Sequence, residues 1–261
     1  MKVIFIGAGN LATNLAKALL QAGHDIIQVY SRTMESAQAL ATLAGGAPTT
    51  DITSVRADAD LYILSVKDSV LAELIPKVCA GRENKVFVHT AGSMPMNLFQ
   101  GMALHYGVLY PMQSFSKQKE VDFSVIPCFI EGNDDYTIQL LEEFVHTFSD
   151  RCYQLSSEDR KYLHLGAVFA CNFVNHCYEL SSEVLQAHGI PFDVMLPLID
   201  ETAQKVHHLS PADAQTGPAL RYDENVIRSQ SLLLKDNPLM KDLYDRMSVS
   251  IHRTELRRKG E

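Results

Sequence analysis

Three things are scarce in this chain of 261 residues, and each scarcity excludes a class of protein. No segment reaches the roughly 18 uninterrupted apolar residues that a membrane-spanning helix needs, and the first apolar run leads directly into a glycine turn, which argues against a signal peptide. Basic residues are in deficit, with a formal net charge of −8, and they cluster only at Arg257-Arg258-Lys259. We therefore expect neither a membrane nor a nucleic acid as a partner.

Cysteine is the third scarce residue, because the five cysteines contain no Cys-x-x-Cys pair and no paired framework. This spacing argues against disulfides and against zinc, so we expect no metal site and a reducing compartment, most simply the cytoplasm. With 46% hydrophobic residues, a chain of this length can bury a full core and is long enough for two modest domains. The composition therefore predicts a soluble globular protein.

The first 32 residues contain the strongest motif of the chain. An apolar strand over 2–7 is followed by the turn Gly7-Ala-Gly-Asn-Leu-Ala12, a helix and a second strand that ends at Tyr30. Gly7 permits a tight turn, Gly9 lets the backbone approach a pyrophosphate, and Ala12 allows close packing of helix and strand. We expect a dinucleotide whose pyrophosphate is held at the helix start by Gly7, Gly9, Asn10 and Leu11. The alternative is a glycine-rich turn of an ordinary α/β protein.

The end of the second strand indicates which dinucleotide binds. Folds that prefer NAD carry an acid here for the ribose hydroxyls, whereas this chain has hydroxyls and a guanidinium. We therefore expect NADP, with its 2′-phosphate held by Ser31, Arg32 and Thr33. In the alternative interpretation Arg32 is a solvated cation at the start of a helix.

The order of elements predicts the fold class. Strands and helices alternate as far as Ser156, which is typical of a doubly wound Rossmann-like sheet of the α/β class. From Ser157 the pattern predicts only helices, over 158–188, 191–208, 223–235 and 238–257. We expect an NADP-binding domain over 1–156 and a smaller all-α domain over 157–261 for substrate binding and dimerisation.

Ligands of open α/β sheets lie beyond the carboxyl ends of the strands, so the residues that follow each strand are candidates. Ser65, Val66 and Lys67 follow one strand and should border the nicotinamide, as should Thr90 in the segment His89-Thr-Ala-Gly-Ser93. The segment Tyr110-Pro-Met-Gln-Ser-Phe115 follows the next strand. For any one polar residue of these segments, ordinary loop structure is an equal alternative.

The predicted helix over 158–188 carries polar residues on one face. They are Lys161, His164, Asn172, Asn175 and Glu179, which together with Val168 fall at steps of three or four. The rest of this helix is apolar, which predicts a buried helix at the centre of its domain. In the functional interpretation His164 is the proton source near neutral pH, Lys161 is a fixed positive charge and Asn172 orients the substrate. The alternative is a hydrogen-bonded strip in a helix–helix or subunit interface.

Several segments resemble known families. The start Val3-Ile-Phe-Ile-Gly-Ala-Gly-Asn-Leu-Ala12, Tyr30-Ser-Arg-Thr33 and Ile63-Leu-Ser-Val-Lys67 look like the NADP-binding half of pyrroline-5-carboxylate reductase and of deazaflavin-dependent NADP oxidoreductases. With His89–Ser93, Tyr110–Phe115, 161–172 and Thr216-Gly-Pro218, nearly the whole chain resembles a bacterial family of NADP oxidoreductases whose helical domain, of the 6-phosphogluconate dehydrogenase C-terminal type, has no assigned function. The resemblance implies the fold, NADP and a homodimer through the helical domain, but no substrate.

Two departures limit the resemblance. The loop that grips the imino-acid carboxylate in pyrroline-5-carboxylate reductase has no counterpart, and Thr216-Gly-Pro218 stands in its region, so proline synthesis is not expected. β-Hydroxyacid dehydrogenases place a lysine and an asparagine four residues apart on this helix, whereas Lys161 is followed at that distance by Leu165. Their proton-transfer pair is therefore not carried over.

These patterns together predict an NADP-dependent oxidoreductase that transfers a hydride between NADP(H) and a small carbonyl or imine substrate. Two alternatives remain open. The protein could bind NADP(H) as a sensor or regulatory protein without catalysis, or it could be an NAD-dependent prephenate-type dehydrogenase in which Arg32 is dispensable.

Overall fold

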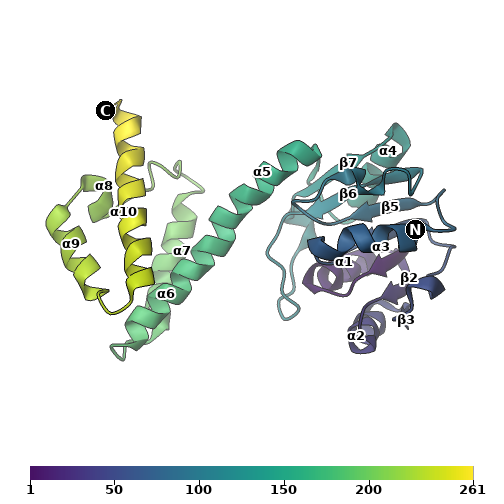
Figure 1. Ribbon diagram of the computed structural model, residues 1–261, viewed down its shortest axis with the longest axis horizontal. Helices are drawn as coiled ribbons and strands as arrows, with labels where there is room; N and C mark the ends of the chain where they lie inside the picture. The colour runs from purple at the N-terminus through teal and green to yellow at the C-terminus, as the bar shows by residue number, and fades with distance from the viewer. Residues whose placement is uncertain (261) are drawn as a thin grey trace. The chain divides into compact units, whose positions relative to one another are not determined.

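The structure is a computed structural model that describes residues 1–260, and these form two compact units that divide after Cys171. The first unit contains an eight-stranded sheet (Figure 1). Its strands are β1 (Lys2–Ile6), β2 (Asp25–Tyr30), β3 (Ala47–Thr49), β4 (Leu61–Leu64), β5 (Val86–His89), β6 (His105–Pro111), β7 (Cys128–Gly132) and β8 (Cys152–Gln154). They lie in the order β3-β2-β1-β4-β5-β6-β7-β8. The first six are parallel, whereas β7 runs antiparallel to β6 and carries β8 parallel beside it.

The central strands are apolar on both faces because helices cover both faces. Alternate residues of β1 pack into two separate cores, with Val3 and Phe5 in one and Ile4 and Ile6 in the other. The first core contains residues of α1 (Asn10–Gln21), α2 (Met34–Ala44) and α4 (Asp135–Val145), and the second contains residues of α3 (Asp68–Cys79). Burying each such side chain contributes about 1.5–3 kcal/mol, so the sequence of β1 alone specifies an interior position.

The strand order reverses direction between β1 and β4, which is where open α/β sheets bind their ligands. The chain passes from β1 outward to β2 and β3, returns to β4 on the other side of β1, and continues outward to β5 and β6. Neighbouring parallel strands that connect in opposite directions leave a gap beyond their carboxyl ends. Gly7 and Ser65 directly follow these two strands, so both flank the gap.

The carboxyl-terminal part is helical. It comprises α5 (Ser157–Ala167), a π-helical turn (Val168–Phe173), α6 (Val174–Gln186), α7 (Leu196–Lys205), α8 (Pro218–Arg221), α9 (Glu224–Leu233) and α10 (Pro238–Lys259). The fold class predicted from the sequence is confirmed. The helices begin at Ser157 as expected, while the compact units divide inside the π-helical turn, and the domain boundary after Ser156 stays a prediction.

The expectation of a buried helix over 158–188 is wrong for the single chain. Arg160 is the one buried residue described in α5, and α6 has none. Among residues 172–260 of the second unit, the buried ones are Ala219, Ser231, Met240 and Ser248. The remaining helices of this unit are too few and too short to enclose an apolar helix, so its large hydrophobic side chains stay at the surface.

The π-helical turn also corrects the predicted polar face. A π turn replaces the i→i+4 pattern with an i→i+5 pattern, and this rotates the residues that follow relative to those before. Residues up to Ala167 and those from Val174 onward therefore do not continue one α-helical face. None of the helices described in residues 1–260 is long and apolar enough to cross a membrane.

Candidate cofactor and active site

The glycine turn after β1 is required by the fold at Gly7. This residue has φ +113°, and a Cβ built on it would lie 2.1 Å from the backbone oxygen of Ser65. The turn is held by Gly7 N–H, which donates to the Tyr30 carbonyl at 2.7 Å. Only glycine allows β1 to turn so close to the end of β4.

Gly9 lies in a different environment, although it is only two residues away. Its φ of −80° suits any residue, and a Cβ built there would meet no described atom within 4 Å. Gly9 is the N-cap of α1, yet no side chain caps this helix and no acid lies in its first turn. The free N–H groups and the positive end of the helix dipole therefore face open space, which fits a bound pyrophosphate.

Asn10 uses its side chain to hold a loop rather than leaving it free. Its Nδ2 donates to the Phe115 carbonyl at 3.1 Å, and Asn14 Nδ2 donates to the Ser116 carbonyl at 2.9 Å. The loop after β6 is thereby tied to the start of α1. Leu11 packs against the core with its side chain. Both residues can contribute backbone N–H groups to an anion site, and Asn10 Nδ2 keeps a second N–H.

Arg32 stands at the end of β2 with its side chain exposed, and it forms no ion pair or side-chain hydrogen bond within residues 1–260. Ser31 donates its backbone N–H to the Thr49 carbonyl at 3.1 Å. Thr33 is the N-cap of α2, where its hydroxyl accepts from Ser36 N–H at 3.4 Å. The three predicted phosphate ligands therefore lie together at the start of α2, and Arg32 is the one with a free charged group.

The residues predicted to border the nicotinamide follow β4 and β5. Ser65 donates its N–H to the Ile6 carbonyl at 2.8 Å, and Thr90, which is 8% exposed, donates its N–H to the Leu64 carbonyl at 3.1 Å. Val66 lies against the second core, and Lys67 is the exposed N-cap of α3. The structure brings these four residues together at the carboxyl edge of the sheet, beside the turn at Gly7.

A second polar cluster lies at the same edge, where β5, β6 and α5 meet. Tyr110 Oη lies 3.1 Å from His164 Nδ1, with the two rings edge to face at 6.1 Å between centroids. A Cβ built on Gly92 would lie 2.6 Å from His164 Nδ1 and 3.0 Å from Tyr110 Cζ. Glycine at 92 therefore leaves the space in which the two side chains meet. Burial raises the pKa of Tyr110, which keeps the phenol protonated at neutral pH.

His89 fixes the segment that carries Gly92. Its Nδ1 accepts from Ala91 N–H at 3.2 Å, which places the ring proton on Nε2, 3.3 Å from the Pro95 carbonyl. The ring is fully buried and stacks on Phe99. Burial lowers the pKa of His89 to about 4, and the charge of Arg160 acts in the same direction. His89 is thus a neutral structural side chain rather than a proton donor at physiological pH.

Arg160 anchors α5 to the sheet, although it is charged and only 1% exposed. Its Nη1 donates to Glu131 Oε2 on β7 at 2.6 Å, and its Nη2 donates to the Met94 carbonyl at 2.6 Å and to Ser157 Oγ at 3.1 Å. Its Nε is buried without a partner among the described residues. Because His164 follows one helical turn later on the same face, this anchor determines where the His164 ring lies.

The other two predicted catalytic residues are not brought to this cluster. Lys161 is exposed, forms an ion pair with Glu158 and lies 5.5 Å from the centroid of the Tyr162 ring. Asn172 is exposed in the π-helical turn and belongs to the second unit. Of the three, only His164 contacts a residue at the carboxyl edge of the sheet.

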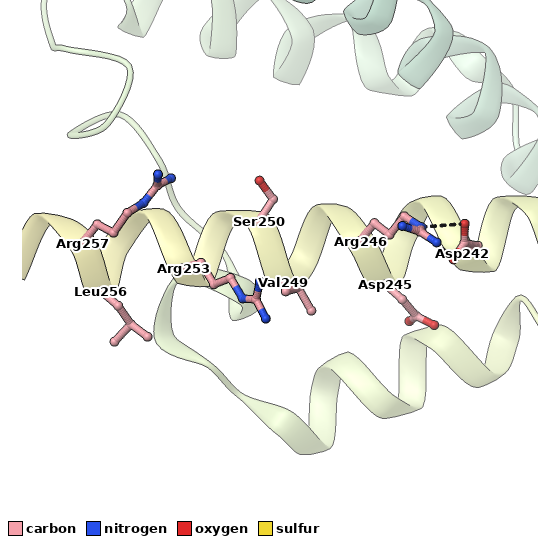
Figure 2. Close-up of a pocket in the computed structure, with 8 residues that line it drawn as sticks. All are labelled: Asp242, Asp245, Arg246, Val249, Ser250, Arg253, Leu256 and Arg257. Carbon is pink, nitrogen blue, oxygen red and sulfur yellow. Dashed lines mark hydrogen bonds and ion pairs between the residues drawn. The ribbon is translucent and has the colours of Figure 1, made fainter. Parts of the chain in front are cut away.

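A groove of about 830 Å³ runs along one helix of the second unit. Figure 2 shows its lining residues along α10, with Arg246 paired to Asp242 and with Arg253 and Arg257 further along the helix. All the lining residues belong to α10, and none is a predicted site residue. The groove is therefore an uncovered helix face and has none of the features of the glycine-turn site.

Sequence reasoning missed Gly92, Arg160 and Glu131, and it left Tyr110 without a role. Tyr110 follows a strand on the correct edge, which is a usable signal. The importance of Gly92 depends on a side chain 72 positions later in the chain, and the buried state of Arg160 depends on Glu131, so neither had a local signal.

Two family models match parts of the chain. Residues 2–92 match the family described as NADP oxidoreductase coenzyme F420-dependent, and residues 126–251 match a domain of unknown function, DUF2520. No curated protein matched the chain.

Solved structures resemble the chain over nearly its full length. A protein from Bacteroides fragilis, titled a putative NADP oxidoreductase, is 56% identical over 97% of this chain and 98% of its own, with a TM-score of 0.94. An imine reductase from Myxococcus stipitatus in complex with NADP+ is 16% identical over 100% and 95%, with a TM-score of 0.72. A pyrroline-5-carboxylate reductase from Coxiella burnetii is 16% identical over 97% and 96%, with a TM-score of 0.59, and these last two likenesses concern the fold alone.

The identity and coverage of the Bacteroides fragilis protein exceed what a shared fold requires. The resemblance seen in the sequence is confirmed: this chain belongs to the NADP oxidoreductase family of that protein, in which a Rossmann domain of the F420-dependent oxidoreductase type precedes a DUF2520 domain.

Proposed function

We propose that the protein is an NADP-dependent oxidoreductase that transfers a hydride between NADP(H) and a small carbonyl or imine substrate. The observation that carries this proposal is the uncapped start of α1 at Gly9, with open space where a side chain would stand. That space suits a pyrophosphate on the free N–H groups of Asn10 and Leu11. The free guanidinium of Arg32 at the next strand end suits the 2′-phosphate of NADP, with Ser31 and Thr33 beside it.

NADPH supplies the hydride when bound, and the nicotinamide would lie along Ser65, Val66, Lys67 and Thr90. Reduction of a carbonyl or imine leaves electron density on the heteroatom, which needs a proton. His164 is a source for this proton, since it lies at the same edge of the sheet and its imidazole can hold and release a proton. Lys161 would add positive charge once released from Glu158, and Asn172 would orient the substrate.

The protein is further proposed to act as a homodimer on a small-molecule substrate in the cytoplasm. The second unit supports the dimer, because its apolar side chains stand exposed, among them Leu198 at 62%, Leu233 at 80% and Leu239 at 71%. Exposed apolar area on this scale is covered by a partner in stable proteins. A second copy of the chain carries the matching surface.

The experiment is an NADPH-oxidation screen with purified full-length protein and a panel of small carbonyls and imines, including pyruvate, glyoxylate and 2-methyl-1-pyrroline. We expect turnover on at least one class. His164→Asn should lower that turnover roughly 10²-fold while NADPH affinity stays within a few-fold. His146→Asn, at an exposed histidine on another helix end, is the matched control.

Three results would count against the proposal. Failure of the wild type to bind NADPH would remove it entirely. Tight binding without turnover on any compound would favour the sensor. An unstable His164→Asn protein whose turnover per folded molecule is unchanged would make His164 a structural residue.

A further inference from the structure

Tyr110 and His164 lie 54 positions apart in the sequence, and their side chains meet at the carboxyl edge of the sheet. We propose that Tyr110 is the catalytic residue that gives a proton to the substrate heteroatom and that His164 returns a proton to Tyr110. This inference rests on the proposed function, because it divides the proton transfer of that reaction between two side chains.

His164 Nδ1 is in contact with the Tyr110 hydroxyl. This nitrogen lies 3.1 Å from Tyr110 Oη, which is hydrogen-bond distance. A proton on Nδ1 therefore has the Tyr110 oxygen as its nearest acceptor. The half-buried ring of His164 remains accessible to solvent, which allows it to regain a proton.

Gly92 leaves the space in which the side chains of Tyr110 and His164 meet. Any larger residue there would place a Cβ within 2.8 Å of both Nδ1 and Cγ of His164 and 3.0 Å from Tyr110 Cζ. Gly92 lies in the segment after β5 and Tyr110 at the end of β6, two neighbouring parallel strands whose carboxyl ends face the same side as the turn at Gly7. The pair is thus built on the edge where a nicotinamide would lie.

Charged side chains act on the Tyr110 phenol. Burial raises the pKa of Tyr110, the positive charge of Arg160 on α5 opposes this effect, and the negative charge of Asp68 at the start of α3 adds to it. Ser93 donates to Asp68, and Glu131 pairs with Arg160, so both charges are held in place. Tyr110 therefore keeps its proton at neutral pH, and Arg160 lies close enough to stabilise the phenolate when that proton leaves.

When the C=O or C=N carbon accepts the hydride, the π pair moves to the oxygen or nitrogen, and Tyr110 gives that atom its phenolic proton while the O–H bond pair stays on Tyr110. The His164 imidazolium then gives its Nδ1 proton to the Tyr110 oxygen and keeps its Nε2 proton, and water returns a proton to Nδ1 after the product leaves. Overall, NADPH, the C=O or C=N substrate and one proton are converted to NADP+ and the reduced C–OH or C–NH product.

The kinetic test uses Tyr110→Phe, which removes one oxygen, and Tyr106→Phe on the same strand as the control. On the best-reduced compound of the panel, Tyr110→Phe should lower turnover roughly 10²-fold with NADPH affinity within two-fold, and Tyr106→Phe should match the wild type. Because both residues serve one proton path, the double variant Tyr110→Phe/His164→Asn should be little slower than either single variant. Multiplied losses, or wild-type turnover in Tyr110→Phe, would overturn this inference and leave the proposed function standing.

A measurement independent of turnover tests the pair itself. The chain has ten histidines, and with ¹⁵N-labelled histidine the His164 signals can be assigned as those lost in His164→Asn. Tyr110→Phe and Gly92→Ala should both move the His164 Nδ1 resonance by several ppm, whereas Tyr106→Phe should not. If the His164 Nδ1 resonance did not move in these variants, the contact between Tyr110 and His164 would be refuted, whichever compounds the protein reduces. Loss of NADPH binding in the wild type would instead remove the proposed function and this inference with it.

Discussion

At Gly7 an added Cβ would meet the Ser65 backbone oxygen at 2.1 Å, and at Gly9 it would meet no described atom within 4 Å. The first glycine serves the fold, and the second leaves space for a ligand. Gly7→Ala should therefore lower the free energy of unfolding by roughly 2 kcal/mol or more. Gly9→Ala should stay within about 1 kcal/mol of the wild type but weaken NADPH binding tenfold or more.

Urea unfolding and NADPH titration of both variants separate the two roles. If Gly9→Ala bound NADPH as the wild type does, the open space at the start of α1 would not be the pyrophosphate site.

His89 makes the stability of the first unit depend on pH. Its pKa is lowered to about 4 in the folded chain by burial, whereas an unfolded histidine titrates near 6.5. The unfolded state then binds more protons between these values, so stability is fully present above about pH 6.5 and is lost as the pH falls toward 4, by up to about 3 kcal/mol.

His89→Phe keeps the stacking on Phe99 but cannot titrate. Urea unfolding at several pH values should show a shallower decline between pH 6.5 and 4 in this variant, together with lower stability at pH 7.5 from the two lost hydrogen bonds. Parallel declines in the two proteins would mean that other groups cause the acid sensitivity.

At the scale of the element, α5 owes its position to the buried pair of Arg160 and Glu131. Removal of Arg160 leaves the largely buried Glu131 carboxylate with Ser157 as its remaining partner, which costs up to about 3–5 kcal/mol. Arg160→Ala should therefore lower the free energy of unfolding by that amount, whereas Lys161→Ala, next in sequence with an exposed ion pair, should cost less than about 1 kcal/mol. Urea unfolding of both variants at pH 7.5 measures the difference, and equal small losses would show that α5 is held by other contacts.

The elements differ in how far the sequence predicts them. The strands over 2–6 and 61–64 and the helix start at Ser157 follow from local apolar patterns and turn residues, so these predictions are confirmed. The antiparallel direction of β7 and the π-helical turn at 168–173 depend on contacts with distant strands and on backbone pairing, which no local pattern records. The edge strand β3, with Pro48 at its centre, likewise has no local strand pattern.

The sequence likewise predicts some residues of the candidate site but not the contacts between them. The glycine turn and the segments after β2, β4 and β5 are each contiguous in sequence, and the structure places them at one edge. The contact of Tyr110 with His164 joins two elements, and its dependence on Gly92 joins a third. Spacing along a single helix predicted His164, but it could not predict what His164 touches.

At the scale of the whole molecule, Ala219 and Met240 are the buried apolar side chains among the described residues of the second unit. A unit of this size cannot be stable without more buried area, so a homodimer is expected. Light scattering at micromolar concentration should give close to twice the 29.1 kDa of one chain. A monomer throughout that range would contradict the dimer and would require the helices to be covered within one chain.

The central claim is that this chain binds NADP(H), and the preference between two cofactors tests it most directly. A 2′-phosphate carries nearly two negative charges at neutral pH, and a well-placed Arg32 should add about 1.5–3 kcal/mol, or tenfold to over a hundredfold in affinity. Titration of the full-length protein with NADPH and NADH, followed by fluorescence, should show NADPH binding more tightly by at least tenfold. The ratio should fall with added salt and largely vanish in Arg32→Ala but not in the exposed control Arg151→Ala. Equal affinities of the wild type for the two cofactors would contradict the role of Arg32, and binding of neither would contradict the dinucleotide site itself.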